Sequence, residues 1–481
     1  MKDLNIYITV AFFVWMAVLL GGGTYLARKA AARSTGDFAV AGGSLGPVRL
    51  IGMNLATYVS AVTLIGFSGY AYASGFALWG LFFGTLVGYL PLALIGKRLQ
   101  KARHNTLSEY LGHRYGSSVV RAWFGLAFAA VYTLFLMLQL VGISVLMQTL
   151  AGLPGWLVSL VVIAVLTVYV AIAGMPVVSL LDSLQALIIF GAVILAGIIA
   201  VVLAGGFGDL FQQARAIDPA LLSATGGGSL TAPILLGAAL GWMGGVACRA
   251  DFAAMAFSAA RPRLAATMFG VTPLLIVVVY LALNMIGLSA AVNLPNLENP
   301  DAAFPAFFDA VLPGWLSWLM VLALISGIVT SCDSYLLTIS SVTANDVLKP
   351  FGKGRLDDRQ VLRVARIAAV AAAGVAYVIS IQDLPIIAIA SLTLFAVWGS
   401  TVFVPLYGAF FWRTGNAAGA LAGSVVGLAV SVTWAFVRPI EGEGLEAIAG
   451  LLTSFVVYVG VSVLTRRSVA EREAAEEPSI A

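Results

Sequence analysis

Long runs of apolar residues, separated by short polar stretches, dominate the sequence. Residues 186–205 are one example, and a run of about 20 apolar residues is long enough to cross the bilayer core as a helix. Thirteen such segments can be drawn, so the pattern predicts an all-α polytopic membrane protein with about 13 transmembrane helices. The expected bounds are 5–27, 47–73, 77–97, 119–150, 155–174, 179–204, 231–257, 265–290, 314–345, 362–381, 385–411, 416–437 and 445–465.

Composition agrees with this pattern. Of the 481 residues, 61% are hydrophobic and 10% are charged, whereas a soluble domain has roughly 25% charged residues. The first segment is long enough to span the membrane, which favours a retained helix over a cleaved signal peptide. Cys248 and Cys332 lie in apolar stretches and are interpreted as small core residues. The two histidines lie in a polar connection, and no residues have the spacing of a metal cluster.

The placement of Lys and Arg predicts the orientation. With the N-terminus outside, the outer loops hold only Lys2, Arg215 and Arg438, and every other basic residue falls on the inner side or its boundary. Cytoplasmic loops carry such an excess. We therefore expect a multi-pass protein of the cell inner (plasma) membrane with a cytoplasmic C-terminus. The expected partners are the lipid bilayer and a small organic solute, with no nucleic acid; the oligomeric state stays unassigned.

Polar side chains inside these segments are the functional candidates, because polar groups at membrane depth are costly. The second segment concentrates them between Asn54 and Thr63, with Thr57, Tyr58 and Ser60 between. One interpretation is a polar face for helix packing. The other is a broken helix whose free carbonyls hold an ion, since unwound backbone in a membrane is tolerated where it lines a cavity.

The ninth segment carries a second group of oxygen-bearing side chains. Thr330, Asp333 and Ser334 lie on one helical face, and Ser331 lies beside them. Hydroxyl and carboxylate oxygens are hard ligands that suit a cation such as Na⁺. The alternative is that these hydroxyls bond back to their own helix, which leaves Asp333 unexplained.

Three further positions are candidates. Asp182 is either a solvated carboxylate at a helix end or a partner of the Thr330/Asp333 face. Gln139 is either an interhelical hydrogen bond or a ligand. The run from Trp242 to Gly245, which contains the pair Gly244 and Gly245, is expected to be a second break point.

The sequence resembles the sodium:solute symporter family, which includes sodium/proline, sodium/galactose and sodium/sialic acid transporters. The resemblance covers about residues 5–465 and depends on four stretches in the family's order. The third departs from the family pattern at Ala173, Val177 and Leu181. The four stretches are 37–46, 106–116, 173–185 and Thr330-Ser331 followed by Ser340-Ser341 and Asn345-Asp346.

The resemblance implies a LeuT-type fold of five plus five helices in an inverted repeat, with one extra N-terminal and two extra C-terminal helices. The implied parts are 1–46 (extra helix and inner loop), 47–204 (first repeat), 205–230 (outer loop), 231–411 (second repeat), 412–465 (two helices) and 466–481 (cytoplasmic tail).

The family's common Na⁺ site also carries over by position. It implies carbonyls of Ala56, Val59 and Gly327 and hydroxyls of Thr330 and Ser331 as ligands. A second cation site found in some members implies Asp182, Thr330, Asp333 and Ser334, although Asp333 stands where the family has Ser. A second carboxylate there could strengthen Na⁺ binding or carry a proton.

The substrate contacts of characterised members do not carry over. Tyr58 and Thr63 stand where sugar transporters have Asn and Gln, and residues 127–150 lack the Arg of sialic acid transporters. An apolar cavity with a few hydroxyls favours a small amino acid or monocarboxylate. The expected pocket residues are Tyr58, Ser60, Thr63, Gln139, Trp242, Gly244 and Gly245.

We therefore expect a secondary active symporter that couples inward Na⁺ flow to uptake of a small organic solute by alternating access. A proton-coupled transporter, with Asp182 and Asp333 as the relay, and a membrane solute sensor of the same fold are the alternatives. An enzyme is not expected, because no nucleophile, base and orienting group stand together.

Overall fold

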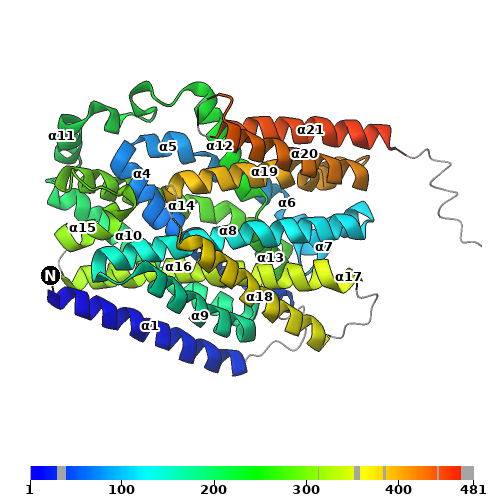
Figure 1. Ribbon diagram of the computed structural model, residues 1–481, viewed down its shortest axis with the longest axis horizontal. Coiled ribbons are helices and arrows are strands. Elements are labelled where there is room, and N and C mark those ends of the chain that lie inside the picture. The colour runs from blue at the N-terminus through cyan, green and yellow to red at the C-terminus, as the bar shows by residue number, and fades with distance from the viewer. Residues whose placement is uncertain are drawn as a thin grey trace, which may run out of the picture.

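The computed structural model is a bundle of long helices whose axes run broadly along one direction (Figure 1). It describes residues 2–29, 39–311, 314–351, 358–382, 386–440, 442 and 444–466. The expected cytoplasmic tail from residue 467 onward, and residues 30–38 of the first inner loop, lie outside the described residues. The helices are α1 (Lys2–Lys29), α3 (Pro47–Tyr58), α4 (Phe67–Ser74), α5 (Ala77–Phe82), α6 (Gly84–Ala102), α7 (Leu107–Tyr115), α8 (Ser118–Ala151), α9 (Gly155–Ala173), α10 (Met175–Leu203), α11 (Phe207–Ile217), α12 (Ala232–Ala247), α13 (Ala250–Ser258), α14 (Pro262–Asn293), α15 (Ala303–Val311), α16 (Gly314–Val342), α17 (Lys349–Phe351), α18 (Asp358–Ser380), α19 (Ile387–Phe411), α20 (Ala417–Val437) and α21 (Leu445–Leu464).

Short turns complete the chain. The two that matter for the site are η2 (Val62–Gly66), a π-helical turn that leads into α4, and η5 (Pro300–Ala302), which precedes α15. A second π-helical turn, η6 (Thr343–Leu348), continues α16. π-helical turns occur mostly as local interruptions of helices and often at functional positions.

Eleven helices within the described residues are long and apolar enough to cross a membrane, or twelve when the bent pair Pro47–Tyr58 and Val62–Ser74 counts as one crossing. Every one of the thirteen expected segments contains helical structure. The count differs from thirteen because the described apolar part of α9, Gly155–Val168, is shorter than the about 20 residues of a crossing. The protein is an all-helical polytopic membrane protein.

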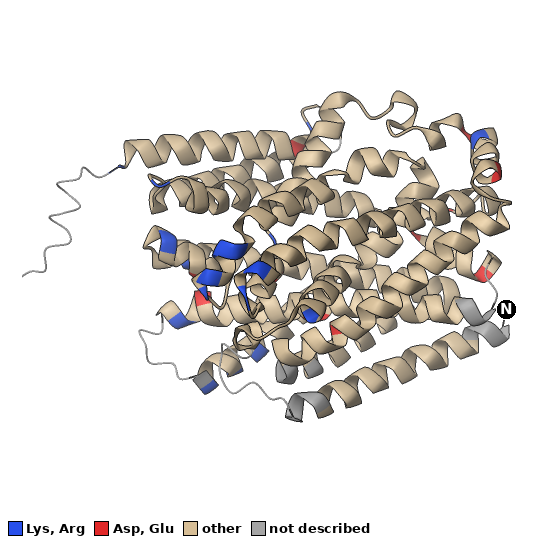
Figure 2. Cartoon of the chain, turned by 180° about the vertical axis from the view of Figure 1, so that it is seen from behind, with Lys and Arg blue, Asp and Glu red and all other residues tan. Residues whose placement is uncertain are grey.

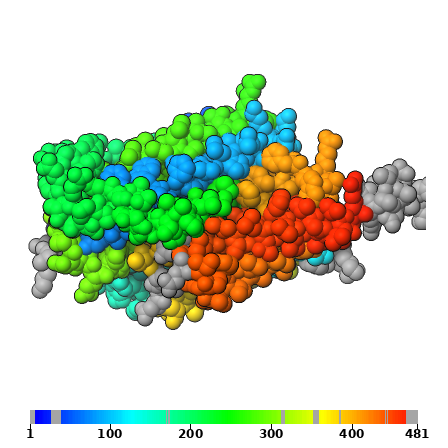
Figure 3. Space-filling view, turned by 90° about the horizontal axis from the view of Figure 1, so that it is seen from above, coloured from blue at the N-terminus to red at the C-terminus, as the bar shows by residue number. Residues whose placement is uncertain are grey.

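The interior of the bundle is built around α16, which packs against α3, α8, α9, α10 and α18. The C-terminal helices α20 and α21 lie together along one side of the surface, drawn in orange and red in Figure 3. They pack on α19 and on each other. This arrangement leaves α3 and α16, which carry the candidate ion ligands, deep in the bundle.

The helix break at the start of the bundle confirms the expectation of an interrupted second segment. The two halves of this segment, α3 and η2–α4, are bent by 54° relative to each other. Val59, at the end of α3, has a φ of −79° and a ψ of 78°, outside the helical region. The backbone around Val59 and Ser60 is therefore free of the regular helical pattern.

The expected break at Gly244 and Gly245 is wrong. Both glycines lie inside α12, and the chain leaves the helix at Cys248 and Arg249 instead. The glycines serve close packing against α19, since a Cβ at Gly245 would lie 2.1 Å from Cδ1 of Phe395. Small residues in membrane helices commonly permit such close contacts between helices.

Candidate ion and solute site

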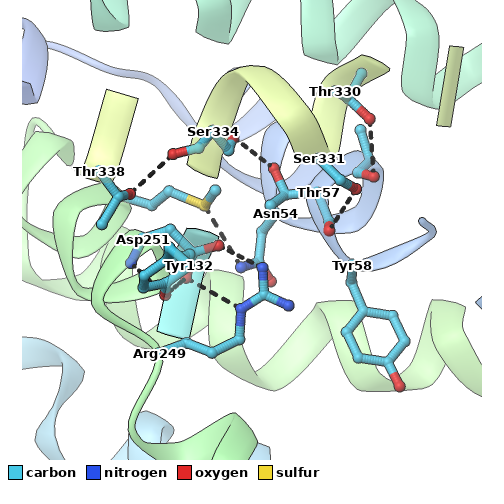
Figure 4. A network of polar contacts seen from close by, with 12 residues as sticks. Asn54, Thr57, Tyr58, Tyr132, Arg249, Asp251, Thr330, Ser331, Ser334 and Thr338 are labelled. Atoms are coloured by element: carbon cyan, nitrogen blue, oxygen red, sulfur yellow. Dashed lines mark hydrogen bonds and ion pairs between the residues drawn. The ribbon is translucent and has the colours of Figure 1, made fainter. Parts of the chain in front are cut away.

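The site begins with the carbonyl groups that the break in α3 leaves near α16. Thr330 Oγ1 donates hydrogen bonds of 3.0 Å to the carbonyl of Ala56 and 3.0 Å to that of Gly327. Ser331 Oγ donates to the carbonyls of Thr57 and Gly327, each over 3.1 Å. Both hydroxyls thus bond back to their own helix and also reach across to α3 (Figure 4).

Gly327 lets the broken backbone approach α16 closely. A Cβ on this residue would lie 2.7 Å from the carbonyl oxygen of Val59, closer than real Cβ atoms come to oxygen. The structure therefore brings together the oxygens of all five residues expected for the first Na⁺ site. Thr57 was missed, although its position next to Ala56 in the polar stretch could have indicated it.

Asp182 faces the bundle interior and not a solvated boundary. Its side chain on α10 is fully buried, and neither carboxylate oxygen has a hydrogen-bond partner among the residues that the structure describes. Its charge interacts with that of Asp333 on α16, which is also fully buried. An unpaired buried carboxylate is costly, and a cation or a proton at this position would reduce that cost.

The hydroxyl of Ser334 connects the two groups of candidate ligands. It shares a hydrogen bond of 3.0 Å with the hydroxyl of Thr57 on α3, and the Ser334 carbonyl accepts one of 2.8 Å from Thr338. Figure 4 shows Thr57 between Ser331 and Ser334. A polar seam therefore follows the contact between α3 and α16.

The residues expected to contact substrate divide into two groups, of which the first surrounds the break. Gln139 Oε1 accepts a hydrogen bond of 2.8 Å from the N–H of Ala61, and Thr63 Oγ1 donates one of 2.8 Å to the Tyr58 carbonyl. Ser60 lies at the break itself and is buried. Gln139 thus makes an interhelical hydrogen bond that supports the second half of the broken helix.

The second group is aromatic. Trp242 is buried against Phe67, Phe82 and Phe395, with ring centroids 4.4 to 5.4 Å apart. Tyr58 points away from Thr330 and Ser331 in Figure 4, and its hydroxyl shares a 2.5 Å hydrogen bond with that of Tyr280. Gly244 and Gly245 contribute packing against α19 and no free backbone.

A buried ion pair at the start of α13 was not predicted. Arg249 and Asp251 are 5% and 3% exposed and form a two-pronged salt bridge. Tyr132 on α8 donates a 2.5 Å hydrogen bond to Asp251 Oδ1. The signal was present, because both charges fall inside the predicted apolar segment 231–257, where ionisable residues are functional candidates.

Comparison with known proteins places this geometry in a family. The model described as the Sodium:solute symporter family matches residues 38–427. The osmoregulated proline transporter OpuE of Bacillus subtilis (strain 168) is 25% identical over 480 residues, which cover 96% of each chain. The high-affinity proline transporter PutP of the same organism is 26% identical over 466 residues, 92% of this chain and 95% of that one.

Solved structures agree on the fold. A Na⁺-coupled sialic acid symporter in a substrate-bound outward-open state matches with a TM-score of 0.81 at 18% identity, over 96% of this chain and 99% of that chain. The nucleobase-cation-symport-1 transporter Mhp1 matches with a TM-score of 0.56 at 16% identity, over 92% and 98%. This chain belongs to the Sodium:solute symporter family, and it is a Na⁺-coupled solute symporter and not an enzyme.

Proposed function

We propose that Na⁺ binds where the broken α3 meets α16. The ligands are the carbonyls of Ala56, Val59 and Gly327 and the hydroxyls of Thr330 and Ser331, with the Thr57 carbonyl at the same place. The observation that carries the proposal is the pair of hydroxyls on α16 that reach the carbonyls of Ala56 and Thr57. When Na⁺ binds, the two hydroxyls would rotate their protons away, and both the hydroxyl and the carbonyl oxygens would coordinate the ion, because oxygen is its preferred ligand.

A second cation or a proton is proposed at Asp182, with Thr330, Asp333 and Ser334 as its neighbours. The support is the burial of Asp182 without a hydrogen-bond partner among the described residues. A cation between Asp182 and Asp333 would offset their mutual repulsion, and so would one proton. Proton coupling is therefore the second candidate function, and it is favoured by this observation alone.

The proposed solute is a small zwitterionic amino acid with an apolar body, and proline is the first compound to test. The relatives OpuE and PutP are named as proline transporters. The buried rings around Trp242, which contact Phe67 at the start of α4, would supply apolar surface for the solute. The solute carboxylate would sit at the N-terminal end of η2, because half-helix N-termini attract anionic groups.

The finer architecture is also proposed. A LeuT-type inverted repeat would pair residues 47–204 with 231–411, and α9 would be a crossing as well. The breaks after Tyr58 and after Ala247 support this pairing, because each lies in the first membrane segment of its half. Residues 1–46 and 412–465 would flank the repeats, and 205–230 would form an outer loop.

The proposed orientation has the N-terminus outside and the C-terminus in the cytoplasm of a cell inner membrane. Figure 2 shows Lys and Arg gathered at one end of the helices, which we call the basic end. Arg98 and Arg114 lie there and bond to carbonyls at the end of α19. An excess of basic residues on the cytoplasmic side of membrane proteins supports this choice.

In the proposed cycle, Na⁺ and solute bind from outside and leave toward the basic end. One positive charge that crosses 100 mV yields about 2.3 kcal/mol, and a tenfold Na⁺ gradient adds about 1.4 kcal/mol. One ion can thus support a several-hundred-fold accumulation. Coupling requires that Na⁺ prefer one of the two states, since equal binding shifts nothing.

The test is uptake of labelled proline and a panel of amino acids and monocarboxylates into proteoliposomes. An inward Na⁺ gradient at equal pH is compared with an inward proton gradient without Na⁺. We expect uptake with Na⁺ only, and saturation by one small amino acid. Uptake that follows the proton gradient alone would replace Na⁺ coupling with proton coupling.

A further inference from the structure

The ion pair between Arg249 and Asp251 lies next to the proposed Na⁺ site, on the side that faces the basic end. Arg249 follows the last residue of α12 by two positions, at the point where the helix is interrupted. Its guanidinium lies over the ring of Tyr335 at 5.6 Å, one residue beyond Ser334 on α16. Figure 4 shows the pair beside Asn54 and below Thr57.

A small pocket extends from this ion pair toward the basic end. Its lining includes Asp251, Ser334 and Thr338, and also Asn105 and Thr106, which lie just before α7. Asp251 thus stands between the polar seam of α3 and α16 and the space beyond it. Asp251 therefore lines the space into which a solute that leaves the Na⁺ site toward the basic end would move.

Besides its packing against α6 and α14, α13 has one set of contacts at each end that bears on a movement of this helix. At its end, Leu45 pairs with the backbone of Ser258 and Ala260 over 2.9 and 3.0 Å, so α13 is joined to the segment just before α3. At its start, Asp251 is bonded to Tyr132 of α8 and Arg249 stacks on Tyr335 of α16. If α13 moves away from α8 and α16, the contacts at its start must break, and if α3 moves with it, so must the hydrogen bonds that join α3 to Thr330 and Ser331 of α16.

The charged contacts at the start of α13 suit a reversible closure. Breaking a buried ion pair by removing one partner is strongly destabilising, because one charge stays buried and unpaired. Opening the pocket instead lets water reach both charges and hydrate them, so the open form keeps favourable partners. The pair would thus be stable in two states, buried in the closed form and hydrated in the open form. Alternating access requires two such states of similar free energy.

We propose that the Arg249–Asp251 pair closes the route from the Na⁺ site toward the basic end through its contacts with Tyr132 of α8 and Tyr335 of α16. The pair positions α13 against α8 and α16; it does not itself bind Na⁺ or solute. This inference is built on the proposed function, in which substrates leave toward the basic end.

The test uses the native cysteines as reporters. Cys248 precedes Arg249, Cys332 lies between Ser331 and Asp333, and both are fully buried. A membrane-impermeant maleimide is applied to one face at a time of oriented vesicles that contain the full chain, and mass spectrometry measures labelling at each cysteine. Arg249→Gln and Asp251→Asn are expected to raise labelling from the basic end about tenfold or more, which is a shift of about 1.4 kcal/mol in the opening equilibrium.

Arg249→Lys keeps the charge but loses the two-pronged geometry, so its labelling is expected to lie between that of the unmodified protein and that of Arg249→Gln. Tyr132→Phe removes one hydroxyl and should raise labelling by less than Arg249→Gln; it also serves where the charge variants do not fold. Unchanged labelling in these variants, an equal rise from both faces, or a Lys variant as reactive as the Gln variant would overturn the proposal.

Na⁺ separates this inference from the proposed function. In the unmodified protein, Na⁺ is expected to slow labelling from the basic end, and Thr330→Ala plus Ser331→Ala should remove that effect. If Na⁺ has no effect while Arg249→Gln still opens one face, the Na⁺ site is wrong and the closing contact stands. If Na⁺ acts but the ion-pair variants do not, the closing contact is wrong.

Discussion

Ser331 Oγ on α16 donates a hydrogen bond of 3.1 Å to the carbonyl of Thr57 on α3, although the two residues are far apart in the sequence. Thr330 reaches Ala56 in the same way, over 3.0 Å. These contacts join an intact helix to an interrupted one at a point where both are buried. The ion chemistry proposed here depends on that junction.

Replacing both hydroxyls, in Thr330→Ala plus Ser331→Ala, should abolish Na⁺-stimulated uptake while the protein still inserts into the membrane. Each single variant should raise the Na⁺ concentration for half-maximal uptake, because each lost oxygen partner costs about 1 kcal/mol. Uptake against Na⁺ concentration is the measurement. Ser340→Ala is the control, since Ser340 is a buried hydroxyl on α16 that bonds to Leu336 of its own helix. Sodium dependence that persists in the double variant would remove the site.

Adding a single methyl group in Gly327→Ala should weaken both the fold and Na⁺ binding. The new Cβ would lie 2.7 Å from the Val59 carbonyl, and overpacking of this kind costs about 1–3 kcal/mol. Thermal unfolding in detergent, with and without Na⁺, measures both effects. Gly191→Ala is the control, because a Cβ there has no neighbour within 4 Å. Equal Tm values for the two variants would show that the close approach of Val59 has no energetic role.

Neutralising the buried carboxylate in Asp182→Asn distinguishes the second Na⁺ ion from a proton. If Asp182 holds Na⁺, a sigmoidal dependence of uptake on Na⁺ should become hyperbolic. If it carries a proton, the pH dependence of uptake should disappear instead. Asp209→Asn, in the exposed first turn of α11, is the control. A variant that keeps both dependences unchanged would exclude Asp182 from either role.

Asp301, in the connection before α15, should make stability depend on pH. Burial raises the pKa of its carboxyl from 3.8 to about 6, and a hydrogen bond from the Ile387 N–H opposes part of that rise. A raised pKa means that the protonated form stabilises the fold below about pH 4, and that this contribution is lost as the pH rises through about 6. The contribution is about 3 kcal/mol.

The variant Asp301→Asn should therefore flatten the dependence of Tm on pH between about 4 and 7. It should also raise Tm at neutral pH, since an amide keeps an acceptor for Ile387 without a buried charge. Thermal unfolding across this pH range is the measurement. A variant whose profile follows that of the unmodified protein would show that another group causes the dependence. Asp218→Asn, on an exposed loop beside α11, controls for general charge effects.

The candidate residues of the ion site, but not their grouping, could be predicted from local sequence. The hydroxyls of Thr330 and Ser331 and the polar stretch around Ala56 could be singled out because polar groups at membrane depth are costly. That they form one site was implied by the resemblance to the family. The close approach of Val59 to Gly327 could not be deduced, because it depends on how two distant helices pack. The carbonyl of Thr57 joins the site for the same reason.

The errors have identifiable physical causes. Gly244 and Gly245 were interpreted as a break, but glycine in a membrane helix also permits close packing, and here the ring of Phe395 occupies that space. The actual break, at Cys248 and Arg249, coincides with a charged residue in an apolar segment. Whether a glycine breaks a helix or permits close packing depends on its neighbours in the bundle. Those neighbours are set by tertiary packing and cannot be deduced from local sequence.

The Gln139 amide is held in one orientation. Its carbonyl oxygen is engaged by the Ala61 N–H over 2.8 Å, which fixes the plane of the amide, while Nε2 has no partner among the described residues. An arriving carboxylate at the break would meet a donor that is already oriented, and little rotational freedom would be lost on capture. If the proposed solute carboxylate binds at the break, the amide that anchors the backbone would also be its preorganised receptor group.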